Sequence, residues 1–250
     1  MAVPVEGPVP TGSTNAYLVD ETVLVDPPAR SDDLDAAVAD ASIDHVAVTH
    51  AHPDHVGAVA DYAAETGATV WCRRGREDRF AEATGIDPDR TLVEGTDLPA
   101  GISVLDVPGH APDHVAFETD RGILCGDVAT AEGSVAVAAP EGDVRAYLVA
   151  LRRLIARDPP RLYPGHGPVI DDPRAVCERL YRHRLDRERR VLDAVRAGGA
   201  DVEGVLDAAY DADLTGVRDL ARRTVVAHLE KLDTERRVDF DRDAETVAPR

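Results

Sequence analysis

The stretch VAVTHAHPDHVGAV at residues 46–59 places three histidines and one aspartate within six positions, directly after a short apolar run. These side chains are His50, His52, Asp54 and His55. Imidazole nitrogens and carboxylate oxygens are ligands that zinc and related first-row metals prefer. Taken alone, the same residues also fit a polar loop with a capping aspartate. The stretch predicts a metal-binding loop between a strand and a helix, provided that other segments supply the remaining ligands.

Three later segments carry further ligand-type side chains. His110 stands in VPGHAPDH, Asp127 in LCGDV and His166 in LYPGHGPV. Each of the three directly follows a glycine, which permits sharp turns and close approach of the backbone. Each also follows an apolar run that predicts a strand. The four segments together predict one site that is built from seven side chains at the ends of strands.

Short apolar runs and helical patterns alternate through the first 170 residues. Strands are expected at 15–19, 22–25, 46–49, 69–72, 102–107, 115–118, 122–125 and 134–138. The first two strands predict a hairpin around Asp20 and Glu21. Helical spacing of apolar residues predicts helices at 32–40, 54–65, 76–83 and 144–156. Intermixed strands and helices predict a layered α/β domain.

The pattern changes after Pro173. Residues 1–173 carry 12 basic and 30 acidic side chains, whereas residues 174–250 carry 16 and 17. Helices are expected at 174–196, 203–209 and 217–233, followed by a short strand at 236–240. The sequence therefore predicts a first domain at 1–173, which carries all seven candidate ligands, and a small helical, winged-helix-like domain at 174–250. The apolar stripe of that second domain must pack on its own core, on the first domain or on a second copy in a homodimer.

The chain is acidic, with a net charge of −19, and 27 of its 28 basic residues are arginine. This composition is typical of halophilic proteins. In molar salt the Debye length falls to about 3 Å, so the net charge says little about partners. Cys72, Cys125 and Cys177 have no CxxC spacing and predict free thiols that are neither disulfides nor metal ligands.

No run approaches the eighteen or more apolar residues that a membrane-spanning helix needs. The first ten residues, MAVPVEGPVP, lack the charged and apolar regions of a secretory signal. We therefore expect a cytoplasmic protein with no membrane partner.

The segments THAHPDH, PGHAPDH, CGD and PGHG together resemble the motifs of the metallo-β-lactamase superfamily across residues 12–172. The resemblance implies an αβ/βα four-layer sandwich and a dinuclear metal-dependent hydrolase. The expected cofactors are two Zn²⁺ ions, with Mn²⁺ or Fe²⁺ as alternatives. The implied ligands are His50, His52 and His110 for the first metal, Asp54, His55 and His166 for the second, and Asp127 between both. The implied nucleophile is a metal-bound hydroxide, since metal binding can bring the pKa of water to about 7. Asp127 would orient this hydroxide and Asp54 would accept a proton, which makes these two the predicted catalytic residues.

The whole chain also resembles a lactamase-β-like group with a C-terminal winged-helix-like domain. The resemblance rests on YPGHGPVI, RLYRHRLDRERRVL and VVAHLEKLDTERRV. Microbial members of this group are glyoxalase II-like, and mitochondrial members are single-stranded RNA endonucleases. Asp26-Pro27-Pro28 replaces the usual DTG-like turn, and the residues after Asp127 lack a GCGR-like signature. The second departure counts against glutathione thioesterases and iron persulfide dioxygenases. His52 replaces the glutamate of flavodiiron oxidoreductases, which favours hydrolysis over redox chemistry.

Three functions therefore stay open at this point. The first is hydrolysis of a small acyl thioester or ester, and the second is cleavage of single-stranded RNA by the same metal site. The third, least favoured, is a non-catalytic DNA-binding regulator, because a structural zinc site needs only four closed ligands. A long basic groove would favour RNA, whereas a short apolar pocket would favour a thioester.

Several other polar residues have two interpretations. His114 is either a group that hydrogen-bonds a metal ligand or an ordinary histidine at the start of a strand. His45 and His183 lie outside the motifs, and His228 is predicted to be a core histidine with its hydrogen bonds satisfied. The run Arg182–Arg190 is either a phosphate-binding face, with Arg184 and Arg187 nearest the site, or a solvated face. We favour the solvated face, with the pairs Arg182–Asp186 and Arg184–Glu188.

Overall fold

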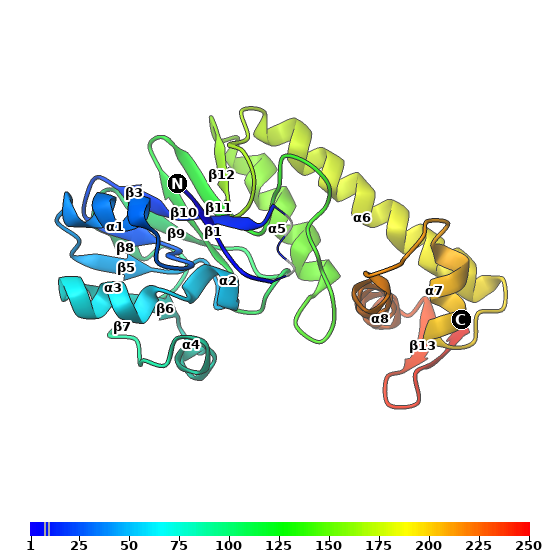
Figure 1. Cartoon of the computed structure of the whole chain (residues 1–250). Helices are drawn as coiled ribbons and strands as arrows, with labels where there is room; N and C mark the ends of the chain where they lie inside the picture. Colours follow the sequence, from blue (N-terminus) through cyan, green and yellow to red (C-terminus); the bar gives the residue numbers. More distant parts are fainter. Residues whose placement is uncertain (8, 10) are drawn as a thin grey trace.

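Two five-stranded sheets form the centre of the computed structural model, which describes residues 1–7, 9 and 11–250 (Figure 1). The first sheet has the order β3 (Tyr17–Val19), β4 (Val23–Val25), β5 (His45–Ala47), β6 (Thr69–Arg73) and β7 (Arg90–Leu92). The second has the order β12 (Leu162–Pro164), β11 (Gly122–Gly126), β10 (Val115–Thr119), β9 (Ile102–Asp106) and β8 (Asp97–Leu98). The predicted hairpin is confirmed: β3 and β4 pair antiparallel, and Asp20 and Glu21 both have positive φ angles.

Apolar side chains of both sheets pack against one another in one buried cluster, which includes Val25, Ala47, Val104 and Phe117. A second cluster joins the first sheet to α1 (Asp32–Ala39), α3 (Val59–Thr66) and α4 (Glu77–Thr84). A third joins the second sheet to α5 (Val144–Arg157) and α6 (Pro173–Arg196). These layers confirm the predicted α/β sandwich, with helices outside and sheets inside.

The helix expected at 54–65 is broken into α2 (Pro53–Val56) and α3. A Cβ atom on Gly57 would lie 2.3 Å from the carbonyl oxygen of Pro28. The N–H of Ala58 donates to the carbonyl of Pro27 at 3.1 Å. The Asp26-Pro27-Pro28 turn therefore packs against the break, and a single continuous helix was the wrong prediction.

The strand expected at 134–138 is also absent from the described structure. Two of its carbonyl groups contact side chains instead of a neighbouring strand. Arg184 Nη2 donates to the oxygen of Val135 at 2.6 Å, and His110 Nδ1 lies 2.7 Å from the oxygen of Ala136. The alternating apolar residues of this segment thus pack in an irregular segment and not in a strand.

The N-terminal strands lie next to the loop that carries His166. β1 (Ala2–Pro4) pairs antiparallel with β2 (Ser13–Asn15), and neither strand was predicted. The side-chain amide of Asn15 donates to the carbonyls of Pro164 and Gly167, both at 2.9 Å. These bonds hold the PGHG segment against the N-terminal hairpin.

Beyond α6 the chain forms α7 (Val202–Ala209), α8 (Arg218–Thr234) and a hairpin of β13 (Val238–Asp241) and β14 (Thr246–Pro249). In Figure 1 the long helix α6 runs from the sandwich to these elements. Buried apolar residues of α7 and α8 belong to the same cluster as those of α5. The three predicted helices are confirmed in place, while the winged-helix assignment and the boundary at residue 173 stay predictions.

None of the helices in the described ranges combines the length and the apolar composition that a membrane span requires. The three cysteines are buried free thiols, as predicted.

His228 is fully buried on α8, as predicted for a core residue, but neither ring nitrogen has a hydrogen-bond partner among the described residues. The prediction that the hydrogen bonds of His228 are satisfied is therefore wrong.

Candidate metal centre

Four segments at the ends of strands bring the seven predicted ligands together. The loop after β5 carries His50 and His52, and the short helix α2 that follows carries Asp54 and His55. His110 lies between β9 and β10, Asp127 follows β11, and His166 follows β12. The seven residues form three overlapping groups in which the potential ligand atoms lie within 4.8 Å of one another. Strand ends thus bring together side chains that are up to 116 positions apart in the sequence.

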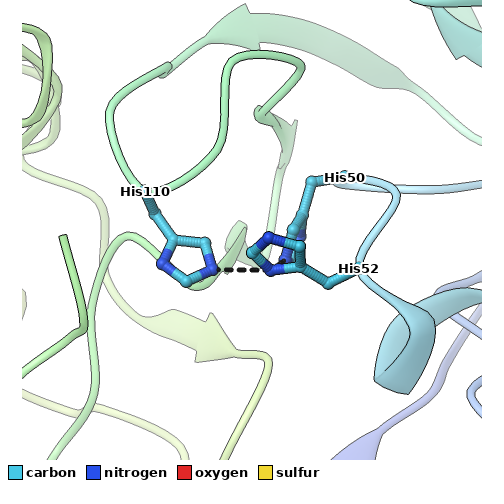
Figure 2. Close-up of side chains that lie close together, drawn as sticks. All are labelled: His50, His52 and His110. Atoms are coloured by element: carbon cyan, nitrogen blue, oxygen red, sulfur yellow. Dashed lines mark hydrogen bonds between the residues drawn. The ribbon is translucent and has the colours of Figure 1, made fainter. Parts of the chain in front are cut away.

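The first group consists of His50, His52 and His110, as Figure 2 shows. His50 Nε2 lies 2.9 Å from His52 Nδ1, and His110 Nε2 lies 3.0 Å from the same atom. The nitrogens of three rings therefore converge on one point.

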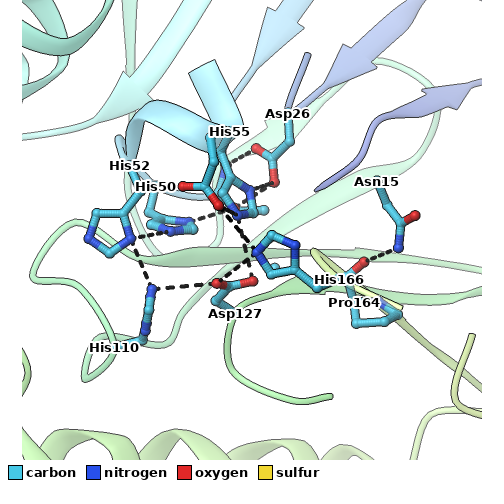
Figure 3. Close-up of polar contacts among 12 residues, drawn as sticks. Asn15, Asp26, His50, His52, His55, His110, Asp127, Pro164 and His166 are labelled. Carbon is cyan, nitrogen blue, oxygen red and sulfur yellow. Dashed lines mark hydrogen bonds and ion pairs between the residues drawn. The ribbon is translucent and has the colours of Figure 1, made fainter. Parts of the chain in front are cut away.

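The second group consists of Asp54, His55 and His166. Asp54 Oδ2 lies 3.9 Å from His55 Nε2 and 3.4 Å from His166 Nε2. Asp127 lies between the two groups (Figure 3). Its Oδ1 is 3.6 Å from His55 Nε2, and its Oδ2 is 3.6 Å from His110 Nε2 and 3.3 Å from His166 Nε2. One carboxylate thus faces both groups, which is the geometry that a bridging ligand requires.

In each of the five histidines, the ring nitrogen that points away from the cluster lies within 3.1 Å of an oxygen. The pairs are His50 Nδ1 with Thr49 Oγ1, His52 Nε2 with Glu141 Oε2, His55 Nδ1 with Asp26 Oδ2, His110 Nδ1 with the Ala136 carbonyl, and His166 Nδ1 with the Ser13 carbonyl. An acceptor at one nitrogen keeps the proton there and leaves the other lone pair free for a metal. The outer contacts therefore select the inner nitrogens as ligand atoms.

The residues present fit a pair of cations. His55 Nε2 is buried and has no hydrogen-bond partner among the described residues, and it points toward Asp127. Several imidazole lone pairs facing one another in a closed space need either protons or a metal between them. Histidine nitrogens with two carboxylates are the donor set of dinuclear centres that hold zinc or other first-row metals.

The protonation of the cluster without metal reflects burial and neighbouring charges. Burial lowers the pKa of His50 and of His110 below the ordinary value. Burial also opposes the charged form of His166, but hydrogen bonds to Asp127 and Asp54 raise its pKa to about 10. Burial would raise the pKa of Asp127, yet the charge of His55 and the hydrogen bond from His166 hold it well below its usual range. The carboxylate of Asp127 is thus in the ionised form that a metal binds.

Asp26 is a functional residue that sequence reasoning missed. Its Oδ1 accepts from the Thr49 N–H at 2.6 Å, and its Oδ2 accepts from Thr49 Oγ1 at 2.7 Å. The same Oδ2 lies 3.1 Å from His55 Nδ1. Asp26 follows β4, which runs parallel to β5, so both strands end at the same edge of the sheet. That pairing was the available signal for placing Asp26 beside the ligand loop.

Glu141, Arg79 and Asp113 were also missed. Glu141 contacts His52, and Arg79 donates two hydrogen bonds to Glu141. Asp113 Oδ2 accepts from the N–H of Ala51 at 2.7 Å, inside the ligand loop. The hydrogen bonds from Arg79 lower the pKa of Glu141 to about 2, so this carboxylate is ionised. No local pattern in the sequence marks these three residues as partners.

His114 contacts two of the predicted ligands. Its Nε2 accepts the backbone N–H of Asp127 at 3.0 Å, and its ring stacks on His50 with the centroids 4.6 Å apart. Burial lowers the pKa of His114 well below its ordinary value, so the ring is neutral and can accept. These contacts favour the interpretation of His114 as a residue that supports the ligands.

A pocket of about 590 Å³ opens from the cluster. Five predicted ligands line it, namely His52, Asp54, His110, Asp127 and His166. The rest of its wall comes from Val9, from the segment 129–136 and from the start of α8 at 216–223. A neighbouring hollow, lined by Pro4, Pro28 and Pro53 among others, shares Val9 and Asp54 with this pocket. Space therefore exists on two sides of Asp54.

The arginine run of α6 adopts neither predicted arrangement in full. Arg184 is buried and donates to the segment 129–136, and Arg187 stacks on Tyr210 with its guanidinium 3.5 Å from the ring centroid. Neither lines the pocket. The predicted pairs Arg182–Asp186 and Arg184–Glu188 are wrong. Arg182 pairs with Glu178, and Glu188 pairs with Lys231 and Arg237.

Similar proteins point to one family. Residues 9–166 match the family model described as the Metallo-beta-lactamase superfamily. A relative from Drosophila melanogaster, named Beta-lactamase-like protein 2 homolog, is 30% identical over 218 residues, which cover 82% of this chain and 73% of that protein. Atrochrysone carboxyl ACP thioesterase from Aspergillus chevalieri is 32% identical over 197 residues, which cover 73% of this chain and 60% of that protein.

Solved structures agree with these relatives. A metallo-beta-lactamase family protein from Thermus thermophilus superimposes with a TM-score of 0.77 at 21% identity, covering all of this chain and 97% of that one. TTHA1623 in a di-iron-bound form has a TM-score of 0.56 at 34% identity and covers 70% of this chain and 96% of that one. The chain therefore belongs to the metallo-beta-lactamase superfamily and is a hydrolase of that fold.

Proposed function

We propose that this hydrolase uses two metal ions, with zinc as the native metal, to cleave a small acyl thioester or ester. The observation that carries the proposal is the pair of ligand groups joined by Asp127, which open into a pocket with largely apolar walls. The five histidines with fixed outer nitrogens supply the metal chemistry. The lining residues of the pocket indicate the class of substrate.

The pocket favours a small acyl group over RNA. Val9, Val135, Val217 and Leu220 line it. Arg223 is the one arginine or lysine among its described lining residues, and Arg223 Nε already lies 3.1 Å from Asp219 Oδ2. Binding to a nucleic acid backbone depends on several cationic side chains that neutralise phosphates. An uncharged acyl group matches this pocket better.

The chain's own residues have distinct roles in this proposal. When bound, the metals supply a nucleophile at neutral pH and stabilise negative charge on the substrate oxygen. Asp127, which faces both ligand groups, holds the two positions together. Asp54 lines the pocket and is a quarter exposed, so its carboxylate is placed to take a proton there. The second hollow beside Asp54 offers room for the leaving group.

The relatives support this choice of substrate class. One relative bears the name of an acyl carrier protein thioesterase, and it matches 73% of the chain at 32% identity. The di-iron form of TTHA1623 makes iron the main alternative to zinc. Iron as the required metal, with oxygen consumption, would move the assignment to a persulfide dioxygenase.

The test combines metal analysis with a choice of substrates. Purified wild-type chain in molar salt is loaded with zinc, manganese or iron and incubated with S-acyl thiols, with simple esters and with a labelled single-stranded RNA. We expect about two metals per chain and thioester or ester hydrolysis that Asp127→Asn abolishes. RNA cleavage without ester hydrolysis, or a stoichiometry of one metal or none, contradicts the proposal.

A further inference from the structure

Glu141 contacts the most exposed histidine of the cluster. The side chain of His52 is 25% exposed, whereas His50, His55, His110 and His166 are each 10% exposed or less. His52 therefore has the least packing around it to fix its ring. Its outer nitrogen Nε2 lies 2.9 Å from Glu141 Oε2, on a segment 89 positions further along the chain.

This contact decides which nitrogen of His52 faces the metal position. A carboxylate acceptor keeps the proton on Nε2, and the lone pair of Nδ1 then points at His50 Nε2 and His110 Nε2. Without the acceptor, the ring is free to place its proton on Nδ1 or to rotate toward solvent. Either change removes one of the three nitrogens of the first group.

Glu141 is itself held in place by a paired contact. Arg79 Nη1 donates to Oε1 at 2.7 Å and Arg79 Nη2 donates to Oε2 at 2.8 Å, which is the two-pronged geometry of a strong arginine–carboxylate pair. Arg79 Nε lies 3.2 Å from Asp113 Oδ1, and the other oxygen of Asp113 accepts from the backbone of Ala51. The network joins α4, the segment before α5 and both loops that carry the first ligand group.

The other four histidines use different supports. His110 and His166 are held by backbone carbonyls, and His50 and His55 by Thr49 and Asp26 at the ends of neighbouring strands. His52 alone relies on an ionised side chain that stands outside both sheets and is 37% exposed. Replacement of this one exposed side chain is therefore expected to act on the first metal position.

We propose that Glu141 is a positioning residue that fixes His52 as a ligand of the first metal position, with Arg79 holding Glu141 in the required orientation. This inference rests on the proposed dinuclear function. Loss of a group that supports a metal-bound histidine typically weakens metal binding by about 10–100-fold. The weakening falls on the first position, because Glu141 contacts no member of the second group.

The test measures both metal affinities in full-length Glu141→Gln, in Arg79→Gln and in the wild-type chain. Each metal-free protein is titrated with Zn²⁺ against a chromophoric chelator in molar salt. Glu82→Gln on α4 is the matched control, since it removes one negative charge from an exposed residue of the same helix as Arg79. Nitrogen NMR of the His52 ring reports which nitrogen binds metal, a signal that a merely structural role would leave unchanged.

We expect Glu141→Gln to bind one zinc about 10–100-fold more weakly while the other zinc keeps its wild-type affinity. The Nδ1 resonance of His52 loses its metal-bound shift, Arg79→Gln shows a smaller change at the same position, and Glu82→Gln shows none. Wild-type affinity at both positions in Glu141→Gln, or equal weakening of both, overturns the inference. If Glu141→Gln does not fold, the same NMR measurement on Glu141→Asp tests the inference.

Failure of the dinuclear proposal is recognised separately from the wild-type titration. A wild-type stoichiometry of one refutes the two-metal centre, and Glu141 is then judged by whether Glu141→Gln weakens that single metal. A wild-type chain that binds no metal overturns both.

Discussion

One wall of the pocket is polar and mostly buried, whereas the other wall is mostly apolar and open. The polar wall consists of the five ligands that line the pocket, and none of their side chains is more than 25% exposed. The open wall is formed by Val9, by the segment 129–136 and by residues 216–223 at the start of α8, where Val217 is 49% and Leu220 is 38% exposed. The comparison suggests that the sandwich supplies the chemistry and that the C-terminal helices select the substrate. We therefore expect that substitutions in one wall leave the other unchanged.

The largest effect is expected on the polar wall, from Asp127→Ala. Loss of the carboxylate that faces both ligand groups removes several kcal/mol of stabilisation at the centre, and each 1.4 kcal/mol is a factor of ten in rate. We therefore expect kcat/KM for ester or thioester hydrolysis to fall by about 1,000-fold or more. Asp120→Ala, at the other end of β11, is the matched control. Activity within tenfold of the wild type would remove Asp127 from the centre.

Removal of the metals from the ligand cluster is expected to lower the thermal stability of the protein. A ligand at 100 times its dissociation constant stabilises the folded state by about 2.7 kcal/mol per site. For a chain of this size, that corresponds to roughly 5–10 °C in Tm. Thermal scans with and without chelator measure the difference. A Tm that chelation leaves unchanged would mean that the cluster holds no tightly bound metal.

A smaller loss is expected from His114→Phe, which keeps a ring beside His50 but loses the acceptor for the Asp127 N–H. Groups that support metal ligands typically contribute 10–100-fold to affinity or activity, and we expect a loss of about that size in kcat/KM. His183→Phe on α6 serves as the control. A loss as large as that of Asp127→Ala would assign His114 a direct role in the reaction.

The smallest effect is expected on the open wall. Val217→Ser combined with Leu220→Ser removes apolar surface from the pocket, and a lost contact of about 1.4 kcal/mol raises KM about tenfold. Metal content should stay at the wild-type value, and kcat should change little. Val149→Ser on α5 is the matched control, because Val149 is equally exposed and lies outside the pocket. Metal loss in the double variant would show that the two walls are coupled.

Local sequence patterns were sufficient to predict the ligand segments and several helices. The spacing of His50, His52, Asp54 and His55 and the glycines before His110, Asp127 and His166 mark strand-end loops without any knowledge of the fold. Helical periodicity likewise gave α5, α6 and α8 within one or two residues. These features depend on residues within a few positions of one another.

Long-range contacts explain the errors and omissions. Glu141 and His52 are 89 positions apart, and no pattern in the sequence pairs one particular glutamate with one particular histidine. The segment 134–138 alternates like a strand, yet the carbonyls of Val135 and Ala136 contact Arg184 and His110 instead of a neighbouring strand. Arg182 had glutamate or aspartate four residues away in both directions, and it pairs with Glu178, because helix side chains lean toward the N-terminus.

The chain's only lysine, Lys231, lies on α8 with its side chain 7% exposed. Its Nζ is 2.6 Å from Glu188 on α6 and 2.7 Å from Glu235. Reagents that acylate amines, including common cross-linkers and fluorescent dyes, therefore meet no accessible lysine side chain in the folded protein. Modification of Lys231 becomes a sensor of local opening, since its amine is reached only when α8 separates from α6. The rate of that labelling would report how often the open wall of the pocket detaches from the rest of the molecule.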